Sequence, residues 1–362
     1  MAFVLGAAQP TGGGELIGIK LRIPDDADRQ WIVAALDRLN GAGFNLVIVE
    51  TFYHGYTICP SQTAKRAGFP SQRPAFRGWN PLDVMVREAH SRGMKVYAWV
   101  ETYYVGNDRV EGPGPILSKK PEWSARRPDG SMKGTGSESD YYFICPANPD
   151  ARRYIADLYC ELARSYALDG LFIDYLRYPV GSLAENPFCF CRHCRSAAAG
   201  ELGLDLGQIR INPKDPDFLR WTEWRQKQTA EALRCFYFRL KKAAPQVSVT
   251  ANVHGGYSSD ILAHDTLRDW AAWCRDGILD IISTQNYSDD DEFVARQIAS
   301  DLAAIPPHVP FLPAIKVEDL SRGGRQLAFI RSTRAVGTAY FVYSRLTDDQ
   351  AKTLAKSRRV RS

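Results

Sequence analysis

The stretch Asp169-Gly170-Leu171-Phe172-Ile173-Asp174-Tyr175-Leu176-Arg177-Tyr178-Pro179 places an apolar run directly before a carboxylate, a guanidinium and two phenols. A short apolar run bounded by polar residues is typical of a buried strand. In a barrel of parallel strands, the carboxyl ends of the strands carry the chemistry. The stretch therefore predicts a strand over 170–175 whose acidic end, Asp174, lies at the functional face of such a barrel.

Seven other apolar runs of similar length alternate with amphipathic stretches along the chain. Asn80-Pro81 and Asn148-Pro149 each place a capping side chain before a proline suited to the first helical turn. Alternating strands and helices predict a parallel sheet, and eight strands predict its closure into a (β/α)8 TIM barrel of the α/β class. The expected strands are 17–23, 44–50, 95–101, 170–175, 247–252, 279–285, 309–315 and 338–343.

No internal repeat or low-complexity linker divides the sequence, so we expect a single barrel domain over residues 15–357. The termini, 1–14 and 358–362, are expected to be flexible. The 362 residues exceed a typical domain, but such barrels commonly hold 250 residues or more. The excess falls in long loops after strands two, three and four, above all the insertions 51–79 and 102–147. Because these loops follow strands, they are expected to crowd the functional face.

Composition narrows the class of protein. Hydrophobic residues make up 45% of the chain and charged residues 24%, which is typical of a globular protein and excludes a disordered one. A net charge of +5 with a basic stretch at 356–361 predicts no nucleic-acid partner, because it does not form a basic face. No apolar run has the roughly 18 residues of a transmembrane segment. Ala2 to Ala8 resembles the end of an export signal without its basic start, so either compartment is consistent with the sequence.

Acidic side chains stand at the predicted strand ends. Glu50, Glu101 and Asp174 end the second, third and fourth strands, and Asp289 to Asp291 and Glu318 follow the sixth and seventh. Glycoside hydrolysis uses two carboxyl groups, one as proton donor and one as nucleophile or base. We predict Asp174 as nucleophile or base and Glu101 as donor, with Glu50 and then 289–291 as alternatives. The competing interpretation is that such acids cap helices or pair with arginines.

Aromatic and polar side chains around the predicted mouth are suited to binding a sugar. Trp99 lies two residues before Glu101, so both side chains project from the same face of the strand and the indole offers a stacking surface. Neutral groups that bind hydroxyls follow other strands. The predicted substrate-binding residues are Glu50, His54, Trp99, Arg177, Tyr178, Asn252, His254, Gln285 and Tyr287.

A cysteine cluster, Cys189-Phe190-Cys191-Arg192-His193-Cys194, follows the fourth strand. Thiolates spaced C-x-C-x-x-C are suited to wrapping a soft metal, and tetrahedral zinc needs a fourth ligand. Cys145 is the best candidate, with Cys59 or His193 as alternatives, so the predicted zinc ligands are Cys145, Cys189, Cys191 and Cys194. Such a zinc is structural, because four thiolates leave no position for water, and we expect no cofactor for catalysis. Free thiols or a disulfide within the loop are equally consistent with the spacing.

Several stretches together resemble one known family. They are Phe52-Tyr53-His54-Gly55-Tyr56 to Pro60-Ser61; Trp79-Asn80-Pro81-Leu82-Asp83 through Glu88 to Gly93 and Ala98-Trp99; Asp169-Gly170 to Asp174 with Tyr178-Pro179; Trp270 through Asp280 to Gln285-Asn286-Tyr287; and Gly337 through Phe341-Val342-Tyr343-Ser344. Over nearly its whole length the chain thereby resembles the glycosyl-hydrolase-like family 10 group, also called domain of unknown function 187. The resemblance implies a (β/α)8 glycosidase-type barrel with a carbohydrate substrate, often exported and often tied to cell-envelope or extracellular polysaccharide.

Three functions are weighed from the sequence, and a glycoside hydrolase leads. Phe172 and Asn252 replace the Arg and Glu of the α-amylase pattern, and Phe172 and Leu176 replace two acids of the chitinase pattern. A carbohydrate-binding barrel without catalysis is therefore the second hypothesis. The third is a sugar-phosphate aldolase or isomerase, because 321–325 offers a Gly-Gly turn between arginines where barrels often bind phosphate, and Lys316 would form the Schiff base.

Overall fold

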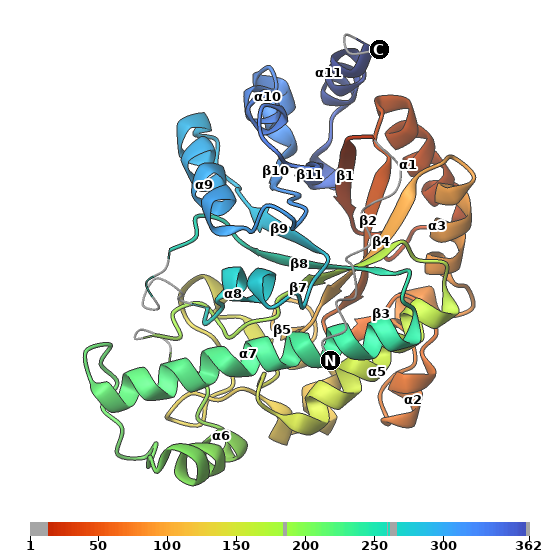
Figure 1. The fold of residues 1–362 in the computed structure, drawn as a ribbon. Coiled ribbons are helices and arrows are strands. Elements are labelled where there is room, and N and C mark those ends of the chain that lie inside the picture. The colour runs from red at the N-terminus through yellow and green to blue at the C-terminus, as the bar shows by residue number, and fades with distance from the viewer. Residues whose placement is uncertain (1–13, 184–186, 259, 261–265, 360–362) are drawn as a thin grey trace.

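The computed structural model of the protein describes residues 14–183, 187–258, 260 and 266–359; most of the two termini predicted to be flexible lies outside them. Eight parallel strands close into a barrel, because β1 pairs with both β2 and β11 (Figure 1). The predicted (β/α)8 fold is confirmed. In order around the barrel the strands are β1 (Leu16–Leu21), β2 (Leu46–Tyr53), β4 (Lys95–Glu101), β7 (Gly170–Asp174), β8 (Ser248–His254), β9 (Ile281–Gln285), β10 (Ala314–Lys316) and β11 (Gly337–Phe341).

Each barrel strand leads to a helix outside the barrel, as Figure 1 shows. The predicted caps are present: Asn80 accepts a hydrogen bond from the Asp83 N–H, and Asn148 accepts from the N–H groups of Asp150 and Ala151. The helices are α1 (Arg29–Ala42), α3 (Pro81–His90), α5 (Pro149–Ser165), α7 (Pro216–Ala243), α8 (Trp270–Arg275), α9 (Asp291–Ala304), α10 (Arg325–Arg331) and α11 (Asp348–Arg359). Among the described residues, none of the helices combines the length and apolar character that a bilayer-spanning helix requires.

Strand β10 differs most from its prediction, since it covers Ala314–Lys316 rather than 309–315. Pro310 and Pro313 lie in the missing part, and a proline has no N–H to donate to a neighbouring strand. The chain still follows the barrel there, because the Leu312 N–H donates to the Ile282 carbonyl at 2.9 Å. The strand is therefore shortened by its prolines without opening the barrel.

Three long connections follow β2, β4 and β7. After β2, the short β3 (Tyr56–Thr57) turns back antiparallel on β2, and α2 (Gln62–Arg66) follows. After β4 come the antiparallel pair β5 (Tyr104–Asn107) and β6 (Tyr141–Phe143) and the helix α4 (Gly114–Lys119). The connection after β7 contains α6 (Arg192–Ala197). All three begin at the carboxyl end of the barrel, where they surround the strand ends.

Apolar side chains fill the barrel interior in close packing. Leu46, Ile48, Tyr97 and Phe172 belong to this inner core, which is separate from the larger core between strands and helices. Gly170 is part of the arrangement, because a Cβ atom there would lie 2.9 Å from the Tyr97 ring. The Asp-Gly motif before the fourth strand therefore makes room for an aromatic ring at the base of the barrel.

Candidate active site

Side chains alternate along the barrel strands, and those that point inward become polar at the carboxyl end. On β4 the inward series is Tyr97, Trp99 and Glu101, and on β7 it ends with Phe172 and Asp174. Glu101 and Asp174 are direct register partners on these neighbouring strands. The fold therefore brings the two predicted catalytic residues side by side above the apolar core.

Asp174 is buried, with 4% of its surface exposed, and accepts four hydrogen bonds. Its Oδ2 accepts from Lys20 Nζ at 3.2 Å and from Asn252 Nδ2 at 2.7 Å. Its Oδ1 accepts from Gln285 Nε2 at 3.4 Å and from the Tyr175 N–H at 2.9 Å. Tyr175 has φ of 51°, in the left-handed region that a tyrosine rarely adopts. Four donors, one of them a cation, thus occupy both oxygens of Asp174.

Lys20, which the sequence analysis did not single out, is only 1% exposed and lies inside the barrel mouth. Its ammonium nitrogen is 4.7 Å from the centre of the Trp99 ring and 4.9 Å from that of Phe172. Burial alone would lower the pKa of Lys20, but Tyr287 and Asp174 beside it raise that pKa above its ordinary value. Lys20 is therefore a buried cation, and it covers one face of the indole that was predicted to stack on a sugar.

Glu50 forms a second ion pair at the mouth, with Arg22. Glu50 is fully buried, its Oε1 accepts from Arg22 Nη2 at 2.8 Å, and its Oε2 accepts from Arg22 Nε. Burial would lower the pKa of Arg22, but the hydrogen bonds and charge of Glu50 raise it. This two-point pair leaves no oxygen of Glu50 without a donor.

Glu101 lies close to both ion pairs, and its own carboxyl group has a raised pKa and, in the part of the chain that the structure describes, an oxygen without a partner. It is 3% exposed, and burial is the largest cause that raises its pKa well above the ordinary value of 4.5. The negative charges of Glu50 and Asp174 raise the pKa further, against the opposing effect of Arg22. Among the described residues, Glu101 Oε2 is buried without a hydrogen-bond partner. A carboxyl group that holds its proton and has an unpaired oxygen is equipped to give that proton to a ligand.

His54 occupies the turn of the β2–β3 hairpin, where it has φ of 50° and Gly55 has φ of 80°. Its ring packs edge-on against Tyr104, with the ring centres 5.3 Å apart. Burial, followed by the charges of Arg22 and Arg73, lowers the pKa of His54 to about 4. The imidazole is thus neutral at pH 7, and its buried Nδ1 has no partner among the described residues. A neutral ring with a free nitrogen is suited to a sugar hydroxyl.

The partly exposed residues of the mouth lie on β8, β9 and β11. His254 is exposed at the end of β8, and Gln285 and Tyr287 are half-buried at and after the end of β9. The Tyr287 ring stacks on Phe341, with 4.9 Å between ring centres. The accessible side chains of the barrel mouth are therefore on this side.

Arg177 and Tyr178, two of the predicted substrate-binding residues, are both buried. Arg177 is 5% exposed and forms a buried ion pair with Glu138, whose Oε1 lies 2.5 Å from Arg177 Nη2. Tyr178 is fully buried, and its N–H donates to the Thr266 carbonyl. The Arg177 guanidinium is committed to a contact between loops, which favours a structural role for it, whereas the Tyr178 hydroxyl is buried without a partner among the described residues.

The alternative acids after β9 serve a helix and its neighbours. Asp290 caps α9, as the competing interpretation expected, and Asp289 pairs with Lys316 at 3.3 Å and with Arg322 at 2.8 Å. Lys316 and Arg322 were the groups suggested for a Schiff base and a phosphate site. Because both cations already face a carboxylate, this region gives little support to the aldolase or isomerase hypothesis.

Lys20 and Arg22 are the functional residues that sequence reasoning missed. Both lie in or just after the first strand at period two from Leu16 and Gly18, which face the barrel interior. The alternation of side chains along a strand was the signal that could have found them. Every second residue from Leu16 points into the barrel, so Lys20 and Arg22, at the carboxyl end, face the acids of the mouth.

The structure also assembles the four predicted metal ligands. The sulfur atoms of Cys145, Cys189, Cys191 and Cys194 all lie within 4.8 Å of one another. Neither Cys59 nor His193, the alternatives for the fourth position, belongs to this group.

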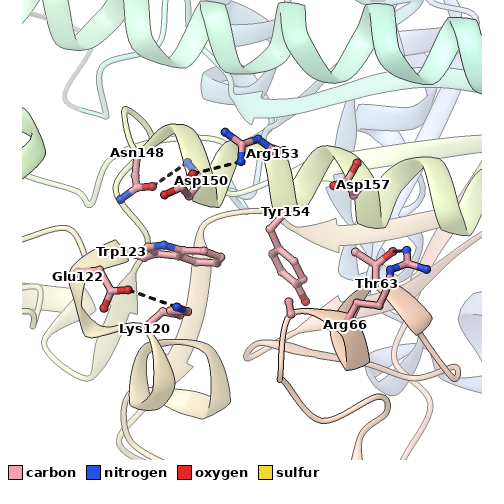
Figure 2. Close-up of a pocket in the computed structure, with 11 residues that line it drawn as sticks. Thr63, Arg66, Lys120, Glu122, Trp123, Asn148, Asp150, Arg153, Tyr154 and Asp157 are labelled. Atoms are coloured by element: carbon pink, nitrogen blue, oxygen red, sulfur yellow. Dashed lines mark hydrogen bonds and ion pairs between the residues drawn. The ribbon is translucent and has the colours of Figure 1, made fainter.

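A separate cavity of about 420 Å³ opens beside α2 and α5 (Figure 2). Trp123 and Tyr154 form its apolar part, and the Arg153–Asp150 ion pair lies at its edge. It contains none of the predicted catalytic or substrate-binding residues. The candidate active site is therefore the barrel mouth.

Comparisons with known proteins agree with this architecture. Glycosyl hydrolase DigH of Escherichia coli K12 is 25% identical over 282 residues, which cover 72% of this chain and 58% of DigH. Glycosyl hydrolase YngK of Bacillus subtilis is 23% identical over 280 residues, which cover 72% of this chain and 49% of YngK. The chain thus spans about half the length of these relatives. The β-galactosidase of the psychrophilic Marinomonas ef1 shares the fold, with a TM-score of 0.68 and 13% identity over 95% of this chain and 59% of its own.

The family model named glycosyl hydrolase-like 10 matches residues 18–304. That range includes the first six barrel strands and therefore Glu50, Glu101 and Asp174 with their ion-pair partners. As its sequence motifs predicted, the protein belongs to the glycosyl hydrolase-like 10 family.

Proposed function

We propose that this protein is a glycoside hydrolase in which Glu101 donates the proton and Asp174 is the nucleophile. The proposal rests on one observation, the contrast between these two carboxyl groups on adjacent strands. Asp174 accepts four hydrogen bonds, one of them from the buried Lys20, whereas Glu101 has a raised pKa and an unpaired oxygen. Cleavage of a glycosidic bond uses one protonated and one ionised carboxyl group.

The reaction takes two steps in this scheme. First, the proton of Glu101 passes to the glycosidic oxygen while Asp174 attacks the anomeric carbon, so that the bond to the leaving sugar breaks and an ester forms. Then the ionised Glu101 takes a proton from water, and the water oxygen displaces Asp174. Register partners on strands about 4.8 Å apart suit the roughly 5–5.5 Å separation of retaining enzymes better than the roughly 6.5–9.5 Å of inverting ones.

The Arg22–Glu50 and Lys20–Asp174 ion pairs are consistent with these roles. Glu50 is fully buried and paired with Arg22, which favours an electrostatic role over direct sugar binding. Its negative charge helps Glu101 to keep its proton. Lys20 lets Asp174 remain ionised in a buried setting, because a lone buried carboxylate is costly.

The substrate we propose is a polysaccharide or oligosaccharide. Trp99 Nε1 and Asn252 Oδ1 are buried polar atoms of the mouth without partners among the described residues, and sugar hydroxyls would satisfy both. His254, Gln285 and Tyr287 form the accessible edge of the site. The family resemblance supports a cell-envelope or extracellular polysaccharide, and with it an extracytoplasmic location.

A carbohydrate-binding barrel without catalysis is the second candidate. The buried Lys20–Asp174 ion pair favours it, because a carboxylate held by a cation at 3.2 Å is a weaker nucleophile. The two candidates differ in whether bound polysaccharide is cleaved.

Cleavage is tested with purified protein on a panel of polysaccharides that includes peptidoglycan glycan strands. We expect new reducing ends from at least one polysaccharide, and we expect the first product, followed by NMR, to keep the anomeric configuration of the substrate. Binding of a polysaccharide in sedimentation assays without any new reducing ends would establish the second candidate instead.

A further inference from the structure

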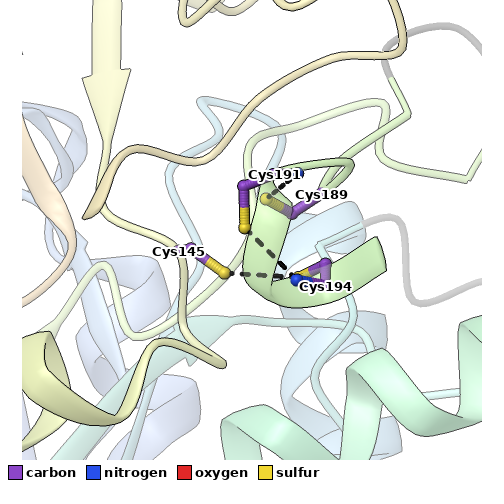
Figure 3. A group of neighbouring side chains, drawn as sticks. All are labelled: Cys145, Cys189, Cys191 and Cys194. Atoms are coloured by element: carbon purple, nitrogen blue, oxygen red, sulfur yellow. Dashed lines mark hydrogen bonds between the residues drawn. The ribbon is translucent and has the colours of Figure 1, made fainter. Parts of the chain in front are cut away.

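Four buried cysteines meet where two long loops touch, as Figure 3 shows. Cys145 comes from the end of the β4–α5 connection, and Cys189, Cys191 and Cys194 come from the β7–α7 connection. All four have 2% or less of their surface exposed. The sulfur atoms of Cys145 and Cys194 are 3.4 Å apart, and all four sulfurs lie within 4.8 Å of one another.

This spacing fits a metal better than it fits disulfides. Four sulfurs at about 2.3 Å from a tetrahedral zinc are about 3.8 Å from one another, inside the observed range. A disulfide needs about 2.05 Å between its sulfurs, and the structure has all four cysteines as free thiols.

Backbone N–H groups point at two of the four sulfurs. Three N–H groups donate to them: those of Arg126 and Cys191 to Cys189 Sγ at 3.3 and 3.4 Å, and that of Cys194 to Cys191 Sγ at 3.5 Å. Arg225 is fully buried beside the cluster and donates to the Phe188 carbonyl. No carboxylate of the described residues forms a salt bridge with this guanidinium. A tetrathiolate metal centre, with its net negative charge, would balance it.

We propose that Cys145, Cys189, Cys191 and Cys194 bind one zinc ion, and that this ion joins the two loops that border the catalytic mouth. With four thiolates the coordination is complete, so the ion is structural and takes no part in hydrolysis. The same loops also meet through protein contacts. The Phe190 N–H donates to the Arg126 carbonyl at 2.7 Å, and Arg177, three residues after Asp174, pairs with Glu138. The zinc therefore adds a further link between the two loops that Arg177 and Glu138 already join near Asp174.

The test measures metal content and thiols in the whole protein, independently of hydrolysis. Protein purified without chelator is expected to hold about one zinc per chain by mass spectrometry. Cobalt in its place is expected to give the intense absorption of a tetrahedral thiolate site. Cys189→Ser and Cys194→Ser are expected to lose at least tenfold in zinc affinity, whereas Cys274→Ser, at an equally buried cysteine outside the cluster, keeps the wild-type affinity.

Thiol titration separates the competing states even where a variant fails to fold. Wild-type protein denatured with chelator and without reductant is expected to titrate eight thiols, one for each cysteine of the chain. A count of about four would mean two disulfides and would overturn the proposal. Eight thiols with no metal bound after incubation of the folded protein with zinc would overturn it equally. For the effect on the loops, removal of zinc is expected to speed hydrogen exchange at 122–147 and 175–183 more than on the far side of the barrel.

Discussion

The two ends of the barrel use polar side chains in opposite ways. At the amino end, Asn45, Asp169 and Asp280 each stand directly before a strand and accept the N–H of the second residue of the neighbouring strand, at 2.8, 2.8 and 2.7 Å. Asp169 also pairs with His90, and Asp280 with Lys241. These groups close the backbone hydrogen bonding of the barrel, so their hydrogen-bonding capacity serves the fold.

At the carboxyl end, the hydrogen-bond donors to the acids are mostly side chains, and two of them are cations. Glu50, Glu101 and Asp174 are all nearly inaccessible, and among the described residues their salt bridges are those of Glu50 with Arg22 and of Asp174 with Lys20. In that part of the chain Glu101 has no such salt bridge, and burial, followed by the charge of Glu50, raises its pKa well above the ordinary value. The acids at the amino end stabilise the fold, whereas at the carboxyl end Glu101 keeps an oxygen without a partner among the described residues.

The largest difference between the ends is expected from the same substitution at each end of β7. Asp174→Asn is expected to reduce kcat by about a thousandfold or more, because it removes the nucleophile. Asp169→Asn keeps an oxygen for the Val96 N–H and is expected to leave kcat nearly unchanged. Steady-state kinetics on the cleaved polysaccharide measures kcat for both variants. Comparable losses of kcat would contradict the different roles assigned to the two ends of β7.

Replacing the proton donor is expected to have a smaller effect that depends on the substrate. Glu101→Gln is expected to lower kcat about a hundredfold or more on a natural glycoside, where the leaving sugar needs a proton. On an aryl glycoside whose phenol leaves without protonation, the loss is expected to be far smaller. Equal losses on both substrates would assign Glu101 another role.

Breaking one ion pair at each end of the barrel is expected to lower the free energy of unfolding by different amounts. Lys20→Met leaves the Asp174 carboxylate buried without a cation and is expected to cost about 3–5 kcal/mol of unfolding free energy. Lys241→Met acts on a pair that is partly exposed and is expected to cost about 1 kcal/mol or less, because Asp280 keeps its backbone donor. Urea denaturation of both variants gives the comparison, and a larger loss for Lys241→Met would reverse it.

The raised pKa of Glu101 predicts a pH dependence of both stability and activity. The folded state binds this proton more tightly than the unfolded chain, so its contribution is complete below the ordinary value of 4.5. The contribution is lost as pH rises through the folded pKa, by about 1.4 kcal/mol for each pH unit between the two values. Hydrolysis falls over the same rise. Unfolding titrations are expected to show this slope in the wild type and a flatter one in Glu101→Gln.

The barrel could be predicted because the spacing of apolar residues that marks a strand or a helix is visible within a short stretch of sequence. The apolar runs mark the barrel strands and the Asn-Pro caps two of the helices, and β10 departs most from its predicted range, because prolines interrupt the ladder there. The pairing of Glu101 with Asp174 also follows from strand ends, since register places them together.

The sequence did not show which side chains would meet across the mouth. Lys20 lies 154 residues from Asp174, and Arg177 reaches Glu138 in a different loop, so neither pair has a local signal. A guanidinium next to a strand end is equally consistent with sugar binding and with joining loops. Only the folded chain distinguishes the two, because the distinction is made by the partner rather than by the residue itself.

The protonation of Glu101 is the most direct test of the account, and it needs no substrate. Infrared spectroscopy of protein with isotope-labelled glutamate is expected to show a protonated glutamic acid at neutral pH that is absent from Glu101→Gln. A spectrum in which every glutamate is ionised at that pH, or one in which the protonated band survives Glu101→Gln, would contradict the account.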